Sequence, residues 1–173
     1  MDDTRTTPDA TPDDLFARFD ALGIAVTTHN HEPVFTVDEA RRLRGVLPGG
    51  HCKSLFLRNK RGDAWLVVCE EDTAVDLKAL AGRLGAGRFS FGSADRLRKA
   101  LGVEPGSVTP FALINDRDVA VTVVLDRRML RHDLLNYHPL VNYKTSAIAR
   151  DDLLKFIEAC GHRPQIVDLA SAE

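Results

Sequence analysis

The sequence predicts a single α+β domain, with a mixed, mainly antiparallel sheet and helices packed against it. Three observations support this class: capped amphipathic helices, short apolar runs separated by turn sequences, and no internal repeat or long linker. A length of 173 residues suits one domain. We expect residues 1–10, which are rich in Thr, Asp and Pro, to form a disordered tail, and residues 11–173 to form the domain.

The helices are predicted from their caps. Thr11-Pro12-Asp13-Asp14 combines a Thr cap, an early Pro and first-turn acids, and the helix it opens ends at Gly23. Thr36-Val37-Asp38-Glu39 is a capping box that opens a short helix through about Leu43. Further helices are predicted at residues 76–84, 93–101 and 150–159.

The strands are predicted from short apolar runs and the turns between them. They cover residues 24–28, 51–58, 64–69, 88–91, 112–114, 119–125 and 165–169. The turn sequence at residues 59–63 predicts a hairpin of the second and third strands. Asn115-Asp116-Arg117-Asp118 predicts another hairpin, between residues 112–114 and 119–125.

Composition narrows the class of protein. No apolar run approaches the roughly 18 residues that span a bilayer, so no membrane partner is expected. The acidic N-terminus lacks the pattern of a secretory signal, and three widely spaced cysteines indicate a reducing compartment. We therefore expect a cytoplasmic protein. The net charge of −2 argues against a non-specific nucleic-acid binder, and no DNA partner is expected.

The charge is unevenly distributed along the chain. Residues 41–61 contain seven Lys or Arg and no Asp or Glu. Such a run suits limited contact with a few phosphates, and a solvated charged face explains it equally well.

A lysine lies within an apolar strand in Gly50-His51-Cys52-Lys53-Ser54-Leu55. Strand alternation puts His51 and Lys53 on one face and Cys52 on the other, so a Cys–His nucleophile is not expected and Cys52 is interpreted as a core residue. Lys53 either pairs with an acid or faces a cavity.

Two further stretches are candidates for chemistry. The rigid loop from Gly102 to Pro110 can aim backbone N–H groups at one point, or it can be a plain connection. Residues 134–148, LLNYHPLVNYKTSAI, mix apolar side chains with His138, Asn142 and Thr145, which indicates a segment with one side in the core and the other facing a pocket. His29 and His31 share a strand face, but without a nearby acid a metal site is not expected.

Four motifs together resemble the prolyl-tRNA synthetase editing-domain superfamily, also called YbaK-like deacylases. They are KSLFL with Lys53, Gly106-x-x-x-Pro110, His138-Pro139-x-x-Asn142-x-x-Thr145, and the run of residues 32–40. The motifs occur in family order over about residues 15–157, and the chain looks closest to the freestanding Ala-tRNA(Pro) deacylases.

The resemblance implies a trans-editing hydrolase that releases alanine from the 3′ end of mischarged Ala-tRNA(Pro). It implies a cofactor-free mechanism, without metal, in which the substrate's ribose hydroxyl helps to activate water. It assigns catalytic roles to Lys53 and to the loop of Gly106. His138, Asn142 and Thr145, with Ser107 and Pro110 of the loop, would bind the substrate.

The partners expected from the resemblance are the acceptor end of tRNA(Pro) and, as a further candidate, prolyl-tRNA synthetase. Arg41, Arg42 and Arg44 would contact the tRNA. Two alternatives stay open. One is a deacylase for another misacylated tRNA, carrying Cys or Ser, and the other is a non-catalytic module that binds tRNA ends or an amino-acid-like ligand.

Overall fold

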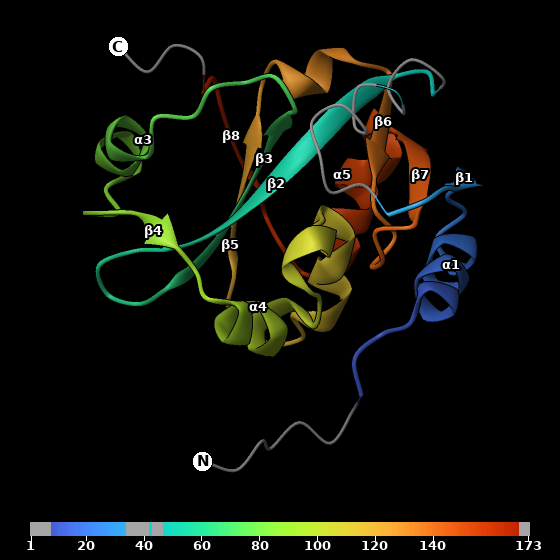
Figure 1. The fold of residues 1–173 in the computed structure, drawn as a ribbon, viewed down its shortest axis with the longest axis horizontal. Coiled ribbons are helices and arrows are strands. Elements are labelled where there is room, and N and C mark those ends of the chain that lie inside the picture. The colour runs from blue at the N-terminus through green and yellow to red at the C-terminus, as the bar shows by residue number, and fades with distance from the viewer. Residues whose placement is uncertain (1–7, 34–41, 43–46, 170–173) are drawn as a thin grey trace.

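The computed structural model describes residues 8–33, 42 and 47–169 (Figure 1). The α-helices are α1 (Pro12–Ala21), α3 (Leu77–Leu84), α4 (Ala94–Leu101) and α5 (Arg150–Ala159). The strands are β1 (Val26–Asn30), β2 (Gly50–Arg58), β3 (Ala64–Glu70), β4 (Ser90–Phe91), β5 (Thr122–Asp126), β6 (Leu134–Tyr137), β7 (Lys144–Ala149) and β8 (Gln165–Val167). Short 3-10 helices are η1 (Pro105–Ser107), η2 (Pro110–Asn115) and η3 (Met129–Arg131).

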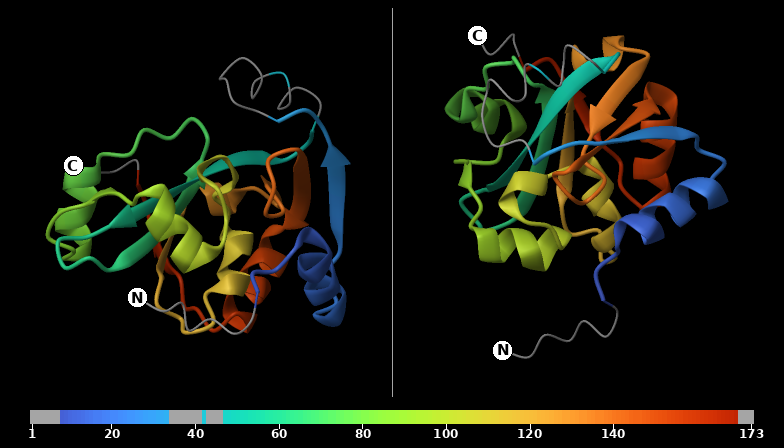
Figure 2. Two further views of the ribbon diagram at one scale, coloured as in Figure 1. Left: turned by 60° about the horizontal axis from the view of Figure 1, so that its bottom comes forward. Right: turned by 45° about the vertical axis from the view of Figure 1, so that its right-hand side comes forward.

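The strands form one mixed sheet in the order β1-β7-β6-β2-β3-β5-β8, with β4 paired to β2. The pairs β1/β7, β6/β7, β2/β3 and β2/β4 are antiparallel, whereas β2/β6, β3/β5 and β5/β8 are parallel. β2 crosses the middle of the molecule, and Figure 2 shows α1 and β1 together at one end of the sheet. The predicted α+β class with a mixed, mainly antiparallel sheet is confirmed.

The predicted helix caps are present. The Thr11 side chain accepts from the Asp14 amide, and the Asp14 carboxylate accepts from the Thr11 amide, which closes a capping box at α1. At α3 and α4 a single side-chain hydrogen bond forms the cap, because Asp76 accepts from the Ala79 amide and Ser93 accepts from the Arg96 amide. The helix predicted from Thr36 lies outside the described residues, apart from Arg42.

Side-chain alternation along β2 separates two apolar cores. Cys52 and Phe56, four residues apart on β2, face the larger core, which α1, α4, α5 and η2 complete. Leu55 and Leu57 face the smaller core under α3, together with Trp65 of β3. The alternation expected from the sequence is therefore confirmed, and His51 and Cys52 diverge as predicted.

The hairpin predicted between residues 112–114 and 119–125 is wrong. Residues 110–115 form η2, and β5 pairs in parallel with β3. Pro110 opens η2 because it has no N–H for a sheet ladder, and Phe111, Ala112 and Leu113 are all buried instead of alternating. Asp116, which was expected in the hairpin turn, instead accepts hydrogen bonds from the Ala120 and Val121 amides.

The first predicted strand is displaced by two residues, since β1 begins at Val26 and Ile24 is buried in the larger core. Before α1, the Ala10 amide donates to Asn115 Oδ1 at 2.8 Å. Residues 1–7 of the predicted disordered tail lie outside the part of the chain that the structure describes.

A buried hydrogen bond between Asp116 and His162 joins the loop before β5 to the residues that follow α5. Asp116 Oδ2 lies 2.8 Å from His162 Nε2 and 2.8 Å from the Val121 amide, and Oδ1 accepts from the Ala120 amide at 3.1 Å. Burial alone would raise the pKa of Asp116, but hydrogen bonds from His162 and the two amides outweigh it and lower the pKa.

Because the pKa of Asp116 is lowered on folding, its contribution to stability is present above the unfolded pKa of about 3.9 and is lost as the pH falls further. We expect Asp116→Asn to reduce the free energy of unfolding at pH 7 by about 3 kcal/mol and to lose part of this acid dependence. Urea unfolding at pH 7, 5 and 3.5 measures both. The exposed Asp118→Asn is the matched control, and equal unfolding curves for the two variants would contradict the prediction.

Candidate active site

One face of the sheet carries a row of polar side chains at the β1-β7-β6-β2 end. The register pairs His29 with Thr145, and Asn136 with both Ala147 and His51, so these side chains share a face. Leu135 and Tyr137 of β6 point to the opposite face and into the larger core. The polar row therefore exists because the core takes the other half of each strand.

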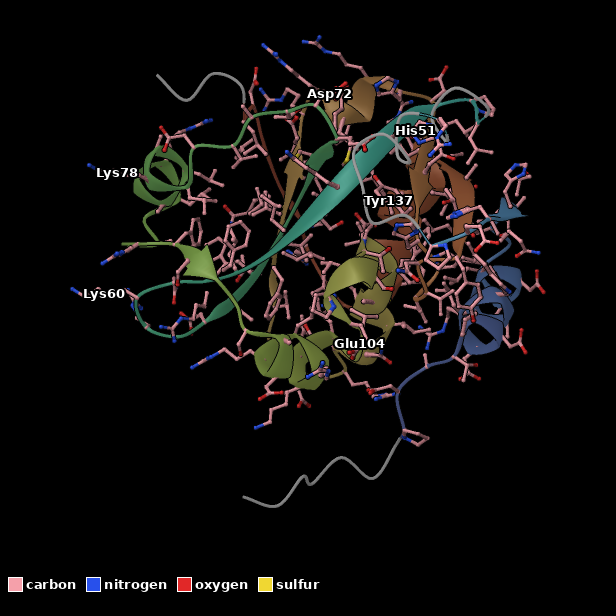
Figure 3. The ribbon with its side chains drawn as sticks, in the orientation of Figure 1. His51, Lys60, Asp72, Lys78, Glu104 and Tyr137 are labelled. Atoms are coloured by element: carbon pink, nitrogen blue, oxygen red, sulfur yellow. The ribbon has the colours of Figure 1, made fainter. Side chains whose placement is uncertain are left out.

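Lys53 belongs to the same face, two residues after His51 on β2. The parallel register of β2 and β6 pairs Gly50 with Leu135 and His51 with Asn136, so Lys53 follows directly after the paired part of β2. The adjacent ends of the two strands are visible in Figure 3, where His51 and Tyr137 are labelled.

Lys53 is half-buried, opposite Cys69 of β3. Burial raises the pKa of Cys69 to about 11, and the positive charge of Lys53 opposes that rise. Within the described residues, Lys53 forms no salt bridge with a carboxylate. Of the two interpretations of Lys53, the arrangement favours a lysine that faces open space over one paired with an acid.

His138 is neutral at physiological pH. Its Nδ1 lies 2.9 Å from the Lys144 carbonyl oxygen, which can only accept, so Nδ1 carries the proton and Nε2 is an acceptor. Burial lowers the pKa of His138, the Lys144 carbonyl opposes that effect, and the nearby His31 lowers the pKa further. A neutral imidazole with an unprotonated Nε2 can accept a hydrogen bond from an ammonium or hydroxyl group.

His31 lies beside His138, with the ring centroids 6.2 Å apart. Its Nδ1 is 2.7 Å from the Glu32 carbonyl oxygen and its Nε2 is 2.7 Å from Thr145 Oγ1, so the buried Thr145 hydroxyl and the Glu32 carbonyl together hold the His31 ring. Thr145 thus belongs to the cluster, but its hydroxyl holds His31. From the sequence, His31 was a candidate only for metal binding, although the spacing of two residues from His29 placed both histidines on one strand face.

The Gly106 turn is adjacent to the loop between β6 and β7. A Cβ added to Gly106 would lie 3.3 Å from Asn142 Nδ2, so the backbone of Gly106 approaches Asn142 closely. Ser107 and Pro110 are buried, and the Ser107 amide donates to the Glu104 carbonyl at 2.8 Å. The substrate-binding role expected for Ser107 and Pro110 stays a prediction.

The structure thus places Gly106 against Asn142, and His138 beside His31, which Thr145 contacts. Lys53 lies on the sheet face of His51 and Asn136. Arg42 is exposed, whereas Arg41 and Arg44 lie outside the described residues. The three cysteines are free thiols, and burial raises the pKa of Cys52 to about 12 and that of Cys160 to about 11. None of these thiols is therefore an activated nucleophile.

The described part of the chain lacks both a metal-binding cluster and a membrane-spanning helix. It contains no group of three or more His, Cys, Asp or Glu side chains placed to hold a metal ion. Nor does any helix within residues 8–33 and 47–169 have the length and apolar character needed to cross a membrane.

Comparison with known proteins agrees with this arrangement. Residues 31–156 match the aminoacyl-tRNA editing domain. The chain is 34% identical over 156 residues to the prolyl-tRNA editing protein ProX of Acetoanaerobium sticklandii, covering 90% of this chain and 95% of that protein. It is 37% identical over 148 residues to the prolyl-tRNA synthetase associated domain-containing protein 1 of Danio rerio, covering 84% and 80%.

Solved structures share the fold. A crystal structure described as that of a candidate trans-editing enzyme for prolyl tRNA synthetase superposes with a TM-score of 0.68 at 19% identity, covering 94% of this chain and 98% of that chain. The family match spans the Lys53 strand, the Gly106 turn and the His138 loop. The chain belongs to the aminoacyl-tRNA editing domain family, and it is an aminoacyl-tRNA deacylase as its motifs predicted.

Proposed function

We propose that this chain acts in trans on mischarged tRNA(Pro) and that its substrate is Ala-tRNA(Pro). The observation that carries the proposal is the neutral His138, whose Nε2 is left as an acceptor in the same β6–β7 segment as Asn142, the residue that the Gly106 turn approaches. The printed name of the Acetoanaerobium relative, a prolyl-tRNA editing protein, supports the choice of tRNA. Residues 11–173 would form this editing domain.

Hydrolysis of the aminoacyl ester builds negative charge on the carbonyl oxygen, and backbone N–H groups can stabilise it. The first N–H groups of a helical turn have no partner within the turn. In η1, Pro105 has no N–H and the Ser107 amide donates to Glu104. The Gly106 N–H is therefore the donor that we assign to the oxyanion, and the absent side chain lets the ester approach.

The remaining side chains position the substrate. His138 Nε2 would accept from the α-ammonium group of the amino acid or from a ribose hydroxyl, and the Asn142 amide borders the same space. Lys53 would hold the terminal ribose or phosphate, so that its role is orientation of the ester. Thr145 would act through His31, with which its hydroxyl forms a hydrogen bond.

The mechanism requires no protein nucleophile. An aminoacyl ester is already activated, and the cysteines of the chain are protonated at neutral pH because burial raises their pKa values. We infer that water attacks the ester directly, and that the substrate's own ribose hydroxyl assists, as the family resemblance implies.

Selection of alanine follows from size. A synthetase pocket shaped for proline excludes alanine weakly, because a missing methylene changes binding by only about 1–3 kcal/mol. A second site too small for proline completes a double sieve. The competing functions are deacylation of tRNA carrying Cys or Ser and binding without turnover.

Hydrolysis of Ala-tRNA(Pro) tests the proposal directly. We expect the wild type to release alanine and to leave Pro-tRNA(Pro) intact, and Lys53→Ala to lower kcat/KM about 100-fold because the ester loses its orientation. Lys78→Ala, an exposed position on α3, is the matched control. Faster release of cysteine or serine than alanine would favour the first alternative, and no turnover of any ester would favour the binding module.

The protonation state of His138 predicts a pH dependence. Because the pKa of His138 lies below its usual value near 6.5, the neutral form persists through pH 7 and is lost only at lower pH. We expect kcat/KM for Ala-tRNA(Pro) to fall only at a pH below the usual histidine pKa near 6.5, and His138→Asn to remove this acid limb along with most activity. His132→Asn, at a histidine whose Nε2 lies 3.4 Å from Glu70 Oε2 and outside this cluster, should keep the wild-type profile. An unchanged profile in His138→Asn would exclude the role.

Charge reversal tests whether the three arginines of residues 41–44 contact the tRNA. Changing Arg41, Arg42 and Arg44 to Glu should raise KM for tRNA and flatten the dependence of KM on salt, because fewer counterions are released on binding. Steady-state kinetics at several salt concentrations measure both quantities. If KM and the salt slope both stay at the wild-type values, these arginines do not contact the tRNA.

A further inference from the structure

A second pocket, of about 260 Å³, lies at the end of β2 remote from Gly50. It is bounded by the β2–β3 hairpin and by α4. The pocket has an apolar floor and a rim of positive charge. The floor residues are Phe56, Ala64 and Ala100, and the rim residues are Arg58, Arg96 and Lys99.

The regular geometry of two elements brings these side chains together. Phe56 and Arg58 are two residues apart on β2 and share its face. Arg96, Lys99 and Ala100 are spaced three and four residues apart on α4, so they form one stripe of the helix. The opposite stripe of α4 is anchored in the core. The cations converge because the fold orients both elements.

The nearby acids already have partners. Asp95 and Glu104 both pair with Arg98, at 3.0 Å and 2.7 Å. The carboxylate of Asp63 accepts from the Asn59 amide group at 3.0 Å. In the part of the chain that the structure describes, neither Arg58 nor Arg96 has a carboxylate within salt-bridge distance.

The positive charge of the pocket therefore arises from where the cations lie and not from the composition of the chain, since the protein as a whole carries a net charge of −2. The like charges of Arg58 and Arg96 repel one another across the pocket, and an anion bound between them relieves the repulsion. The adjoining hairpin turn adds Lys60, which extends outward in Figure 3, and the neighbouring Arg61. A guanidinium matches the geometry of a phosphate and can bind it through two hydrogen bonds.

The pocket is connected to the candidate active site by α4. The helix ends at Gly102, and the chain then passes through Glu104 to the Gly106 turn, as Figures 1 and 3 show. Along β2, Arg58 lies five residues from Lys53, about 17 Å in an extended strand, and this odd spacing turns the two side chains to opposite faces. The route from the pocket to the site therefore follows α4 to the Gly106 turn. A ligand that reaches both places must be long and must repeat its negative charge, as a nucleic-acid backbone does.

We propose that this pocket binds backbone phosphate of the tRNA acceptor stem while the aminoacylated 3′ end occupies the Gly106 turn. The inference rests on the proposed function, and it assigns part of the basic run of residues 41–61 to a surface built with α4. Arg58, Arg96 and Lys99 would supply phosphate contacts that carry no sequence information, so they would set affinity and orientation.

The test compares two triple variants that each remove three charges. One is Arg58→Gln/Arg96→Gln/Lys99→Gln, and the control is Arg127→Gln/Arg131→Gln/Arg163→Gln on exposed positions outside the pocket. Binding of uncharged tRNA(Pro) is measured by fluorescence anisotropy over a range of salt. We expect the pocket variant to bind at least tenfold more weakly, with a salt slope smaller by about two to three, and the control to resemble the wild type.

A kinetic arm separates this inference from the proposed function. The pocket variant should raise KM for Ala-tRNA(Pro) but hydrolyse an alanyl ester of the CCA trinucleotide at the wild-type rate, because that substrate is too short to reach the pocket. Equal affinity and salt slope for both triples, or equal slowing on both substrates, would overturn the inference. If the wild type releases no alanine, the proposed substrate fails, and the binding arm still decides the pocket.

Discussion

Strand β2 must serve two opposite environments at once, and the rest of the structure follows from this constraint. It pairs with β3, β4 and β6, so it joins the two halves of the sheet. Its alternate side chains are Phe56 in the larger core and Leu57 in the smaller one, which fixes the register, because a slip of one residue would exchange all of them. Lys53 is thereby presented on the face where the smaller core ends.

The candidate active site is an electrostatic arrangement as much as a shape. His138 is kept neutral by burial and by its neighbour His31, while the Lys144 carbonyl fixes the tautomer. His31 is itself held by Thr145. Such a site favours positioning and hydrogen bonding over nucleophilic attack, which suits a substrate whose ester bond is already activated. The surface pocket at the other end of β2 has the opposite character, because its rim is formed by permanent charges.

Local signals predicted much of the fold. Thr11, Asp76 and Ser93 cap helices where the sequence placed them, because a cap depends on residues within one turn. The second hairpin failed for a non-local reason. Asn115 and Asp116 have turn chemistry, but their side chains bond to Leu101 and His162, which only the folded chain brings near. Similarly, a buried 3-10 segment and a short buried strand look alike as apolar runs.

The sequence alone determined the family, through motifs around Lys53, Gly106 and His138, together with the α+β class and the separation of His51 from Cys52. It could do so because motif residues and strand alternation are properties of short segments. Only the tertiary structure decided that Thr145 holds His31, that the Gly106 turn approaches Asn142, and that Arg58 joins two cations of α4. These contacts join residues far apart in the chain, and their distances depend on how the sheet and helices pack.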